Sequence, residues 1–319
     1  MIKVDRVVKY FGKAKAVDDI SFEVEEMENV ALLGTSGCGK TTTLRMINRL
    51  IEISSGSISI AGKNIIDVPQ ENLRRNIGYV LQHNGLFPHY TVAENIAIVP
   101  NLLQWPKNKI ANRVLELSDQ LNLPREYLSL YPNQLSGGQQ QRVGLARGLA
   151  ADPPVLLMDE PFGALDAVTR SNITKEFSRL EVLKKKTIVL VTHDIREAFD
   201  MGDKILLMDK GKIIQAGTPT DLLFKPVNKF VSDFFEGQRM QLELHSVSLK
   251  ELWPYLSIDK SAHKDLPEIA EDKTLWDALD TLSNHRNTDI AIRSILSGEV
   301  RHAGYNSLFN ALGTMKEMR

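Results

Sequence analysis

The sequence predicts an α/β fold, in which helices cover a mostly parallel sheet and a smaller region follows at the C-terminal end. The first observation is a glycine-containing loop at 34–41, which follows the apolar segment 30–33 and precedes a helical pattern near 40–50. The second is an alternation of short apolar segments with longer helical patterns after residue 150. Strands that alternate with helices in this way favour βαβ units and therefore a parallel sheet.

The composition limits the classes of protein to which the chain can belong. With 319 residues and an apolar share of 43%, it is long enough for a main domain and a smaller second one. Its formal net charge of -1 gives no overall basic footprint for nucleic acid. The single cysteine, Cys38, excludes an intramolecular disulfide bond and favours a reducing compartment. No apolar run approaches the roughly 18 residues of a membrane span, so any membrane association is expected to come through partners.

The expected elements follow in order along the chain. Short apolar and β-branched segments predict a strand-rich flank, at 2–8, 20–24, 30–33 and 58–60. From about 84 to about 140 the pattern changes to longer helices, notably at 109–121, and this change predicts an inserted helical subdomain. Beyond it the expected elements are strands at 155–158, 187–191 and 205–208, with helices at 167–183 and 195–201.

The main domain, 1–240, is expected to be followed by a distinct C-terminal region, 241–319. The apolar spacing there predicts one helix, through Leu275, Ala278, Leu279 and Leu282. The pattern continues with a β segment at 289–295, a turn at Ser297-Gly298, and a final helix near 308–312. This order resembles a single repeat of a CBS (cystathionine-β-synthase-type) domain, and an unrelated α/β tail is the alternative.

The strongest chemical signal is the loop at 34–41, which matches the phosphate-binding pattern G-x-x-x-x-G-K-[ST] in its required setting between a strand and a helix. Its glycines let backbone N–H groups curl around phosphate, and the helix N-terminus adds a positive dipole. Lys40 is then placed to neutralise β- and γ-phosphate oxygens, and the Thr41 hydroxyl to bind Mg²⁺. Thr42 can touch the α-phosphate or serve as an ordinary helix residue. The candidate nucleotide-binding residues are Gly34, Thr35, Ser36, Gly37, Cys38, Gly39, Lys40, Thr41 and Thr42.

Two more patterns follow the phosphate loop at long spacing. The run Leu135-Ser136-Gly137-Gly138-Gln139 opens a helix, and the buried-type strand 155–158 leads into Asp159-Glu160. The strand delivers Asp159 towards the Mg²⁺ shell. Neighbouring residues of a strand face opposite ways, so Asp159 and Glu160 can serve different tasks only because the strand ends there. Surface carboxylates, and a glycine-containing helix start that binds nothing, are the alternatives.

The order of these three patterns resembles that of the ATP-binding-cassette (ABC) superfamily, and the resemblance covers about residues 1–240. It implies a P-loop NTPase cassette with a β-rich flank and a helical subdomain at about 84–140, and it implies ATP hydrolysis. In this superfamily ATP is held between two copies of the domain. A chain with one copy is therefore expected to act as a homodimer, with ATP and Mg²⁺ as cofactors.

The resemblance also implies roles for particular side chains. Glu160 matches the general base that polarises the attacking water. His193, which ends the apolar segment 188–192, matches the switch histidine that reaches the γ-phosphate, and a structural histidine is the alternative. Gln82 matches the glutamine that contacts Mg²⁺ or water where the core meets the helical insert.

Other matches concern the adenine base and the second subunit. Tyr10 matches the aromatic residue that stacks on adenine, with Phe11 as its competitor. Asp166, in Ala164-Leu165-Asp166, is expected at the dimer seam near the opposite site. The residues expected to bind the γ-phosphate from the other subunit are Ser136, Gly137 and Gly138.

Some stretches outside the hydrolytic centre resemble the ATPase subunits of bacterial importers for glycine betaine, choline, carnitine and related osmoprotectants, at 46–52, 73–80, 85–89 and 99–106. This resemblance implies membrane permease partners, an extracytoplasmic solute-binding protein, and a place at the cytoplasmic face of the cell membrane. Members of the group often carry paired CBS repeats, whereas this chain has room for one, so its regulation stays open. One alternative is an importer ATPase for an amino acid or polyamine. The other is a soluble ABC ATPase acting on nucleic acid or ribosomes, which the balanced charge disfavours.

Overall fold

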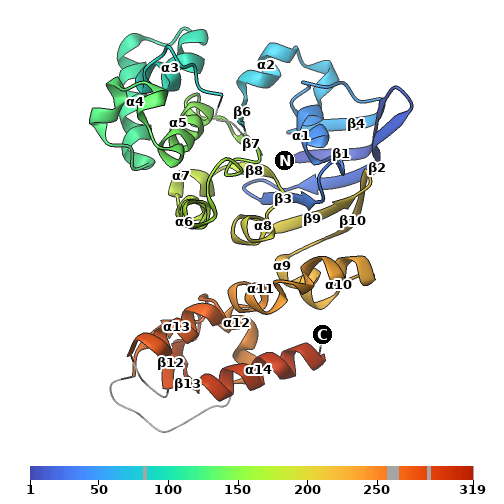
Figure 1. Cartoon of the computed structure of the whole chain (residues 1–319), viewed down its shortest axis with the longest axis vertical. Coiled ribbons are helices and arrows are strands. Elements are labelled where there is room, and N and C mark those ends of the chain that lie inside the picture. Colours follow the sequence, from blue (N-terminus) through green and yellow to red (C-terminus); the bar gives the residue numbers. More distant parts are fainter. Residues whose placement is uncertain (82–84, 257–265, 286–288, 319) are drawn as a thin grey trace. The chain divides into compact units, whose positions relative to one another are not determined.

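The computed structural model describes residues 1–81, 85–256, 266–285 and 289–318, and its contacts divide the chain into two compact units, Met1–Ala216 and Gly217–Arg319 (Figure 1). This division lies before residue 240, where the sequence pattern suggested the end of the main domain. The reason lies in three helices, α9 (Pro219–Phe224), α10 (Lys229–Glu236) and α11 (Arg239–Ser246). α9 packs on both α10 and α11, and α11 packs on the later helix at 275–285, so all three belong with the C-terminal residues.

An antiparallel sheet forms the N-terminal flank of the first unit, in the order β2-β1-β4-β5. Its strands are β1 (Ile2–Phe11), β2 (Ala14–Val24), β4 (Ser55–Ile60) and β5 (Lys63–Asn64). Ile2 pairs with Val24 on one side and with Ile60 on the other, so β1 lies in the middle. The expected β-rich flank is present, although the segment 30–33 is not part of it.

That segment belongs to the second, central sheet, in the order β10-β9-β3-β8-β7-β6. The strands are β3 (Asn29–Gly34), β6 (Ile77–Val80), β7 (Val155–Asp159), β8 (Thr187–Thr192), β9 (Lys204–Asp209) and β10 (Lys212–Gly217). The strands from β9 through β6 pair in parallel. β7 and β8 are buried along their whole length, which explains why they read as continuous apolar runs rather than as alternating ones.

Helix α1 (Lys40–Ile47) lies in the core between the two sheets. Its residues Leu44 and Met46 are buried in one apolar cluster with Val4 of the flank and with Leu32 and Val191 of the central sheet. The helix ends at Ile47, short of the expected residue 50, because Arg49 adopts a left-handed backbone with φ 47°. The phosphate loop is thus held between a central strand and a fully anchored helix.

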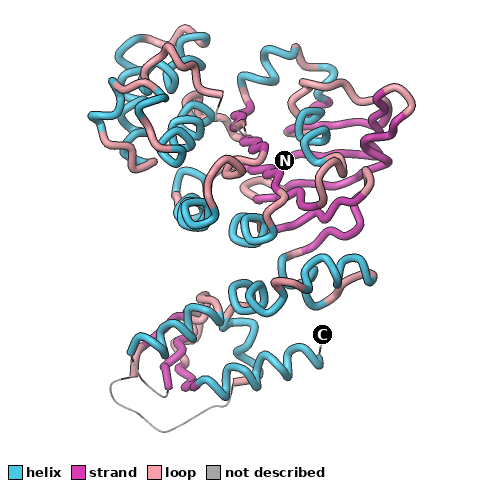
Figure 2. The backbone as a smooth tube through the Cα atoms, in the orientation of Figure 1, coloured by secondary structure: helices cyan, strands magenta, loops and turns pink. Residues whose placement is uncertain are grey.

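A group of helices forms the expected insert between β6 and β7 (Figures 1 and 2). It contains α3 (Val92–Leu102), α4 (Lys107–Gln120), α5 (Gly137–Leu149) and the short 3-10 turns Arg125–Ser129 and Pro132–Gln134. The apolar stripe of α4, through Ile110, Val114 and Leu117, is buried, as its helical spacing predicts. Before the insert, α2 (Gln70–Arg75) packs on β6.

The helix expected at 167–183 is two helices, α6 (Ala167–Ser178) and α7 (Glu181–Lys184), separated by the turn at Arg179-Leu180. α8 (Ile195–Met201) follows β8 and packs on β3 and β8. Because the central strands are parallel, the loops after β3, β7 and β8 meet at one edge of the sheet. The register places Leu33 beside Thr192, and Asp159 beside Val191, at that edge.

The second unit is built around a sheet in the order β11-β12-β13. Its further elements are α12 (Leu249–Leu252), the 3-10 turn Trp253–Tyr255, β11 (Glu268–Ala270), α13 (Leu275–His285), β12 (Asp289–Arg293), β13 (Val300–Gly304) and α14 (Tyr305–Met318). The expected helix, the β segment and the final helix are present in that order, but the strands β11 and β13 were not predicted, β12 ends at Arg293 instead of 295, and α14 is longer than the expected 308–312. Within the described part of the chain, no helix has both the length and the apolar content to cross a membrane.

Candidate functional site

The phosphate loop has a backbone that only glycine can adopt at two points. Gly34 has φ 152°, and a Cβ atom there would lie 2.2 Å from the Met208 carbonyl oxygen. Gly39 has φ 107°, and its Cβ would lie 2.6 Å from the Ala16 carbonyl oxygen. The loop is therefore packed against the rest of the fold, whereas Thr35, Ser36 and Gly37 at its tip are exposed.

The side chain of Lys40 is enclosed by this loop and is only 4% exposed. Its Nζ donates hydrogen bonds to the carbonyl oxygens of Gly34, at 2.8 Å, and Thr35, at 2.9 Å. Cys38 lies buried beside it, and burial raises the pKa of the Cys38 thiol. A neutral, buried thiol fits a packing role, so the positive charge inside the loop is that of Lys40.

Asp159, at the end of β7, faces the helix that follows the phosphate loop. The Thr41 hydroxyl donates to Asp159 Oδ1 at 2.9 Å, and the Tyr79 hydroxyl lies 3.4 Å from Oδ2. Arg45, one helical turn after Thr41, lies 3.7 Å from the same Oδ2. Burial, followed by the nearby Asp159 carboxylate, raises the pKa of Tyr79 to about 12, so its hydroxyl stays a donor.

Glu160 and His193 face each other across the ends of neighbouring strands. β7 ends at Asp159, and Glu160 takes a left-handed backbone with φ 47° while its N–H donates to Val191 O at 2.9 Å. Such a backbone is strained for a residue other than glycine and is common at functional sites. The turn brings Glu160 Oε2 within 3.1 Å of His193 Nδ1.

The remaining residues of the nucleotide group lie as follows. Thr42 is half-buried in the first turn of α1. Tyr10 and Phe11 end β1 and are both largely exposed, and each has a lysine ammonium over its ring. Gln82 lies outside the described residues.

The run 135–139, called the signature segment from here on, forms the start of α5. Ser136 caps this helix: its hydroxyl accepts from Gln139 N–H, while Gln139 Oε1 accepts from Ser136 N–H. Gly138 is packed so closely on α6 that a Cβ there would lie 2.5 Å from Ile173 Cδ1. Among the described residues, no hydrogen bond links 136–138 to the phosphate loop of the same chain.

Asp166 caps α6 in the same manner, since its carboxylate accepts from the N–H groups of Val168 and Thr169. The side chain and then the backbone of Thr169 hold the pKa of Asp166 below its usual range. The structure thus brings together the phosphate loop, Asp159, Glu160 and His193. The segment 136–138 lies instead near Leu165, and so beside Asp166.

Sequence reasoning missed four side chains at or next to the site. Arg45 and Tyr79 contact Asp159, while Arg170 of α6 contacts Asp194 and Glu197 of α8 contacts Thr192, the two neighbours of His193 in the chain. Helical spacing gave one usable signal, because Arg45 stands four residues after Thr41 and so shares its face of α1. Tyr79 and Arg170 depend on contacts between elements far apart in the sequence, whereas Glu197 lies five residues after its partner Thr192.

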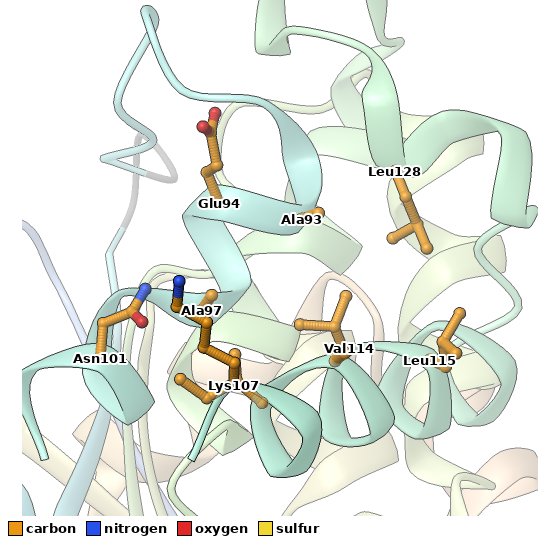
Figure 3. A pocket seen from close by; sticks show the side chains of 10 residues that line it. Ala93, Glu94, Ala97, Asn101, Lys107, Val114, Leu115 and Leu128 are labelled. Atoms are coloured by element: carbon orange, nitrogen blue, oxygen red, sulfur yellow. The ribbon is translucent and has the colours of Figure 1, made fainter. Parts of the chain in front are cut away.

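A separate hollow of about 520 Å³ lies in the helical insert, between α3 and α4, and contains none of the predicted site residues. Figure 3 shows Val114, Leu115 and Leu128 turning apolar side chains toward it. Its polar lining consists of Glu94, Asn101 and Lys107. Without a loop of backbone N–H groups, it does not resemble a phosphate site.

A model of the ABC transporter family matches residues 17–163 of this chain. Among curated relatives, the glycine betaine/carnitine/choline transport ATP-binding protein of Bacillus subtilis is 43% identical, over 94% of this chain and 78% of its own length. The glycine betaine uptake system ATP-binding protein of Escherichia coli is 49% identical, over 88% of this chain and 89% of its own. A sulfate/thiosulfate import ATP-binding protein of Nocardia farcinica is 45% identical, over 77% and 73%.

Solved structures resemble the first unit. One is a dimeric ATP-binding cassette in a post-hydrolysis state with bound ADP and Pi, which is 33% identical at a TM-score of 0.60. The match covers 68% of this chain and 98% of that one. The residues matched by the family model, 17–163, include the phosphate loop, the strand that ends in Asp159, and helix α5.

Proposed function

Because the chain belongs to the ABC transporter family, we propose that it hydrolyses ATP to energise the import of a quaternary-amine osmoprotectant across the cytoplasmic membrane. Glycine betaine, carnitine and choline, for which its relatives are named, define the solute class. The observation that carries the hydrolytic part is the contact of Glu160 with His193, immediately after Asp159. The solute class rests on the relatives, since an ATPase subunit does not touch the solute.

Thr41 and Asp159 are the residues that would hold Mg²⁺, together with Gln82. A hydroxyl and a carboxylate that already lie 2.9 Å apart are hard oxygen donors of the kind Mg²⁺ prefers, and the partners of Asp159 leave Oδ1 turned toward Thr41. When bound, the ion would neutralise charge on the phosphate oxygens. Lys40 acts on the same oxygens, and the exposed N–H groups at the loop tip cradle them.

In this mechanism Glu160 is the general base that accepts a proton from the attacking water. His193 holds the Glu160 carboxylate through Nδ1, which leaves its other ring nitrogen available to the γ-phosphate. The strained backbone of Glu160 keeps its carboxylate on the His193 side of the strand end. Tyr10 stacks on adenine, with Phe11 as the alternative.

A second copy of the chain completes each site. Ser136, Gly137 and Gly138 make no hydrogen bond with the phosphate loop of their own chain, while Ser136 and Gly137 are exposed at a helix start. They bind the γ-phosphate of the partner copy through N–H groups and the Ser136 hydroxyl. Asp166 lies at the same seam. The dimeric solved relative supports this arrangement.

A permease docks on a groove of about 360 Å³ that adjoins the segment after β6. The groove is lined by both apolar and basic side chains, among them Leu81, Phe87, Ile98, Val99, Arg74, Arg75 and Arg147. Phe87 is largely exposed and lies in an aromatic group with His89 and Tyr90, as a docking surface requires. Closure of the ATPase dimer is transmitted to the permease through this groove. Docking on the permease places the chain at the cytoplasmic face of the membrane.

An extracytoplasmic solute-binding protein delivers the cargo to the permease in this proposal, and no nucleic acid takes part. The C-terminal unit, as a single CBS-like repeat, is the candidate regulatory part. The similarity to a sulfate/thiosulfate import protein keeps another small solute as the second candidate.

The test is ATP-dependent uptake of glycine betaine into proteoliposomes that hold this subunit with its neighbouring permease and binding protein. The proposal expects uptake that stops when Glu160→Gln replaces the wild-type chain. Uptake of sulfate but not of betaine would transfer the assignment to the second candidate. ATP hydrolysis with neither uptake would remove the osmoprotectant class and keep the ATPase.

A further inference from the structure

We infer that Arg170 is a positioning residue that joins the Leu165-Asp166 turn to the segment carrying His193, so that the placement of the histidine depends on the seam between two copies. The inference rests on the proposed function, because that function puts Asp166 at the seam and His193 at the γ-phosphate. It adds a residue outside every predicted motif. It also gives a physical route by which arrival of the partner copy reaches the hydrolytic residues.

The guanidinium of Arg170 binds two segments at once. Its Nη2 donates to the Leu165 carbonyl oxygen at 2.8 Å, and its Nη1 lies 3.1 Å from Asp194 Oδ2. The backbone of Arg170 is fixed as well, because its N–H donates to Asp166 O in the first turn of α6. The arginine is thus anchored on the turn and reaches across to the loop after β8.

Asp194 connects Arg170 to the backbone around His193 through its own hydrogen bonds with Thr192 and Glu197. Its Oδ1 caps α8 by accepting from Glu197 N–H at 3.2 Å, and its own N–H donates to the Thr192 hydroxyl at 2.9 Å. The Thr192 hydroxyl in turn donates to the buried Glu197 at 2.8 Å. His193 therefore lies between two residues that are both held, and a shift of Asp194 moves its backbone directly.

The fork of an arginine is needed for this bridge. A lysine at 170 has a single ammonium and a different shape, so it can keep the charge contact with Asp194 without the geometry that also reaches Leu165 O. Loss of the bridge leaves the phosphate-loop contacts with ATP in place, since none of its members belongs to that loop, and displaces only the His193 contact with the γ-phosphate. The expected defect is therefore in the rate of hydrolysis and not in nucleotide binding.

A simpler role is that the pair only fastens α6 to α8, which pack on each other. That role predicts a loss of stability with no change in turnover per folded molecule. A matched control exists in Arg113, which is also partly buried and bridges the Leu149 and Ala150 carbonyl oxygens to carboxylates of Glu116 and Asp152. Arg113 belongs to the helical insert and contacts no predicted site residue.

The experiment measures kcat and KM for ATP, with the thermal unfolding midpoint, for full-length chains in the permease complex. The variants are Arg170→Met, Arg170→Lys, Asp194→Asn, the double variant Arg170→Met/Asp194→Asn, and Arg113→Met. We expect Arg170→Met to lower kcat about tenfold, which is about 1.4 kcal/mol of barrier, with KM within about twofold. Asp194→Asn should lose a similar factor, and the double variant no more than either alone.

Arg170→Lys should stay clearly below wild type, and Arg113→Met should keep wild-type kcat whatever its midpoint. Multiplying losses in the double variant, full activity of Arg170→Lys, or a kcat for Arg170→Met within twofold of wild type would overturn the inference. If Arg170→Met does not fold, Asp194→Asn and Arg170→Lys still decide it by the same criteria. A wild-type complex without ATPase activity would remove the proposed function itself, which is a distinct result.

Discussion

At the scale of single residues, the hydrolytic centre is a set of side chains fixed before any nucleotide arrives. Lys40 is held by two carbonyl oxygens of its own loop, and Glu160 by a strained backbone and the contact with His193. In the proposed function the two residues have different tasks, Lys40 in nucleotide binding and Glu160 in the chemistry. Substituting them should therefore separate binding from turnover.

Glu160→Gln should leave ATP binding intact, because the amide has the same size as the carboxylate and the substitution changes no residue of the phosphate loop. Without a base, kcat should fall by at least about a hundredfold. The ATP-bound dimer should then accumulate. Sedimentation velocity with and without ATP measures this, and turnover within tenfold of wild type would remove Glu160 as the base.

Lys40→Ala should instead weaken nucleotide binding itself, since it deletes the buried ammonium inside the loop. The dissociation constant for ATP is expected to rise by at least about tenfold, as for loss of a charge-assisted contact. A fluorescent ATP analogue reports this directly. Thr43→Ser is a suitable control, because Thr43 lies in the same helix and bonds only Gly39 O. Unchanged affinity in Lys40→Ala would contradict the phosphate-loop assignment.

Glu197 predicts a pH dependence of stability. Burial raises the pKa of Glu197 to about 8, with the Asp194 and Glu160 carboxylates adding to the rise and the Thr192 hydroxyl and Arg170 opposing it. In the unfolded chain the ordinary value is 4.5. The unfolded chain thus releases a proton between these two values while the folded chain keeps it, so stability falls as pH rises through this window.

Glu197→Gln cannot ionise and should remove that fall. The variant is expected to be no less stable than wild type at pH 5 and more stable by on the order of 3 kcal/mol near pH 8. Urea unfolding at several pH values measures it. The exposed Glu26 supplies the control, since Glu26→Gln should leave the pH dependence unchanged. Parallel pH curves for wild type and Glu197→Gln would sink the prediction.

At the scale of elements, sequence patterns located most strands and helices but did not show which elements pack or pair with one another. β3 was grouped with the flank because its apolar run looks like the others, although burial on both faces makes it a central strand. The split between α6 and α7 has no glycine or proline to mark it, although Arg179 and Leu180 form a turn held by local backbone hydrogen bonds. β11, with three residues, is too short for a pattern to reveal.

The candidate site was predictable where a motif carries its own geometry. The loop 34–41 and the end of β7 are local, so their residues could be named from the sequence alone. Arg170 could not, because its partner Asp194 follows another strand and is brought to it only by the parallel register of β7 and β8. Glu197 contacts Thr192, five residues before it, but no local pattern shows that its carboxyl group is buried.

Within the second unit, the buried carboxylate of Glu243 connects helices α11 and α14 through an ion pair. This carboxylate on α11 is only 3% exposed and is held by Arg239 at 3.0 Å and by Lys316 of α14 at 2.5 Å. Lys316→Met should destabilise the unit by about 1–3 kcal/mol, because it leaves part of a buried charge without its partner. Combining it with Glu243→Gln should give less than the sum of both losses in urea unfolding. Additive losses would show that the pair does not interact.

At the scale of the whole molecule, the decisive claim is that each ATP site uses two copies of the chain. One copy supplies Lys40 and Glu160, and the other supplies Ser136. Lys40→Ala should remove the contribution of the copy that supplies the phosphate loop, and Ser136→Arg that of the opposite copy. Ser136→Arg also loses a helix cap worth about 1 kcal/mol, but it removes no core contact. Each variant alone then has no intact site.

Mixing the two variants separates a shared site from a site within one chain. In a mixed dimer one site carries both defects and the other carries neither, because the two contributions come from opposite copies. With equal amounts and random pairing, about a quarter of the sites are intact, so about a quarter of wild-type ATPase activity should return. A mixture as inactive as its components, although cross-linking shows mixed dimers, would mean that Lys40 of one copy and Ser136 of the other do not share a site. Recovery that grows with the fraction of mixed dimers instead ties turnover to the seam, where Asp166 and Arg170 would sense the partner.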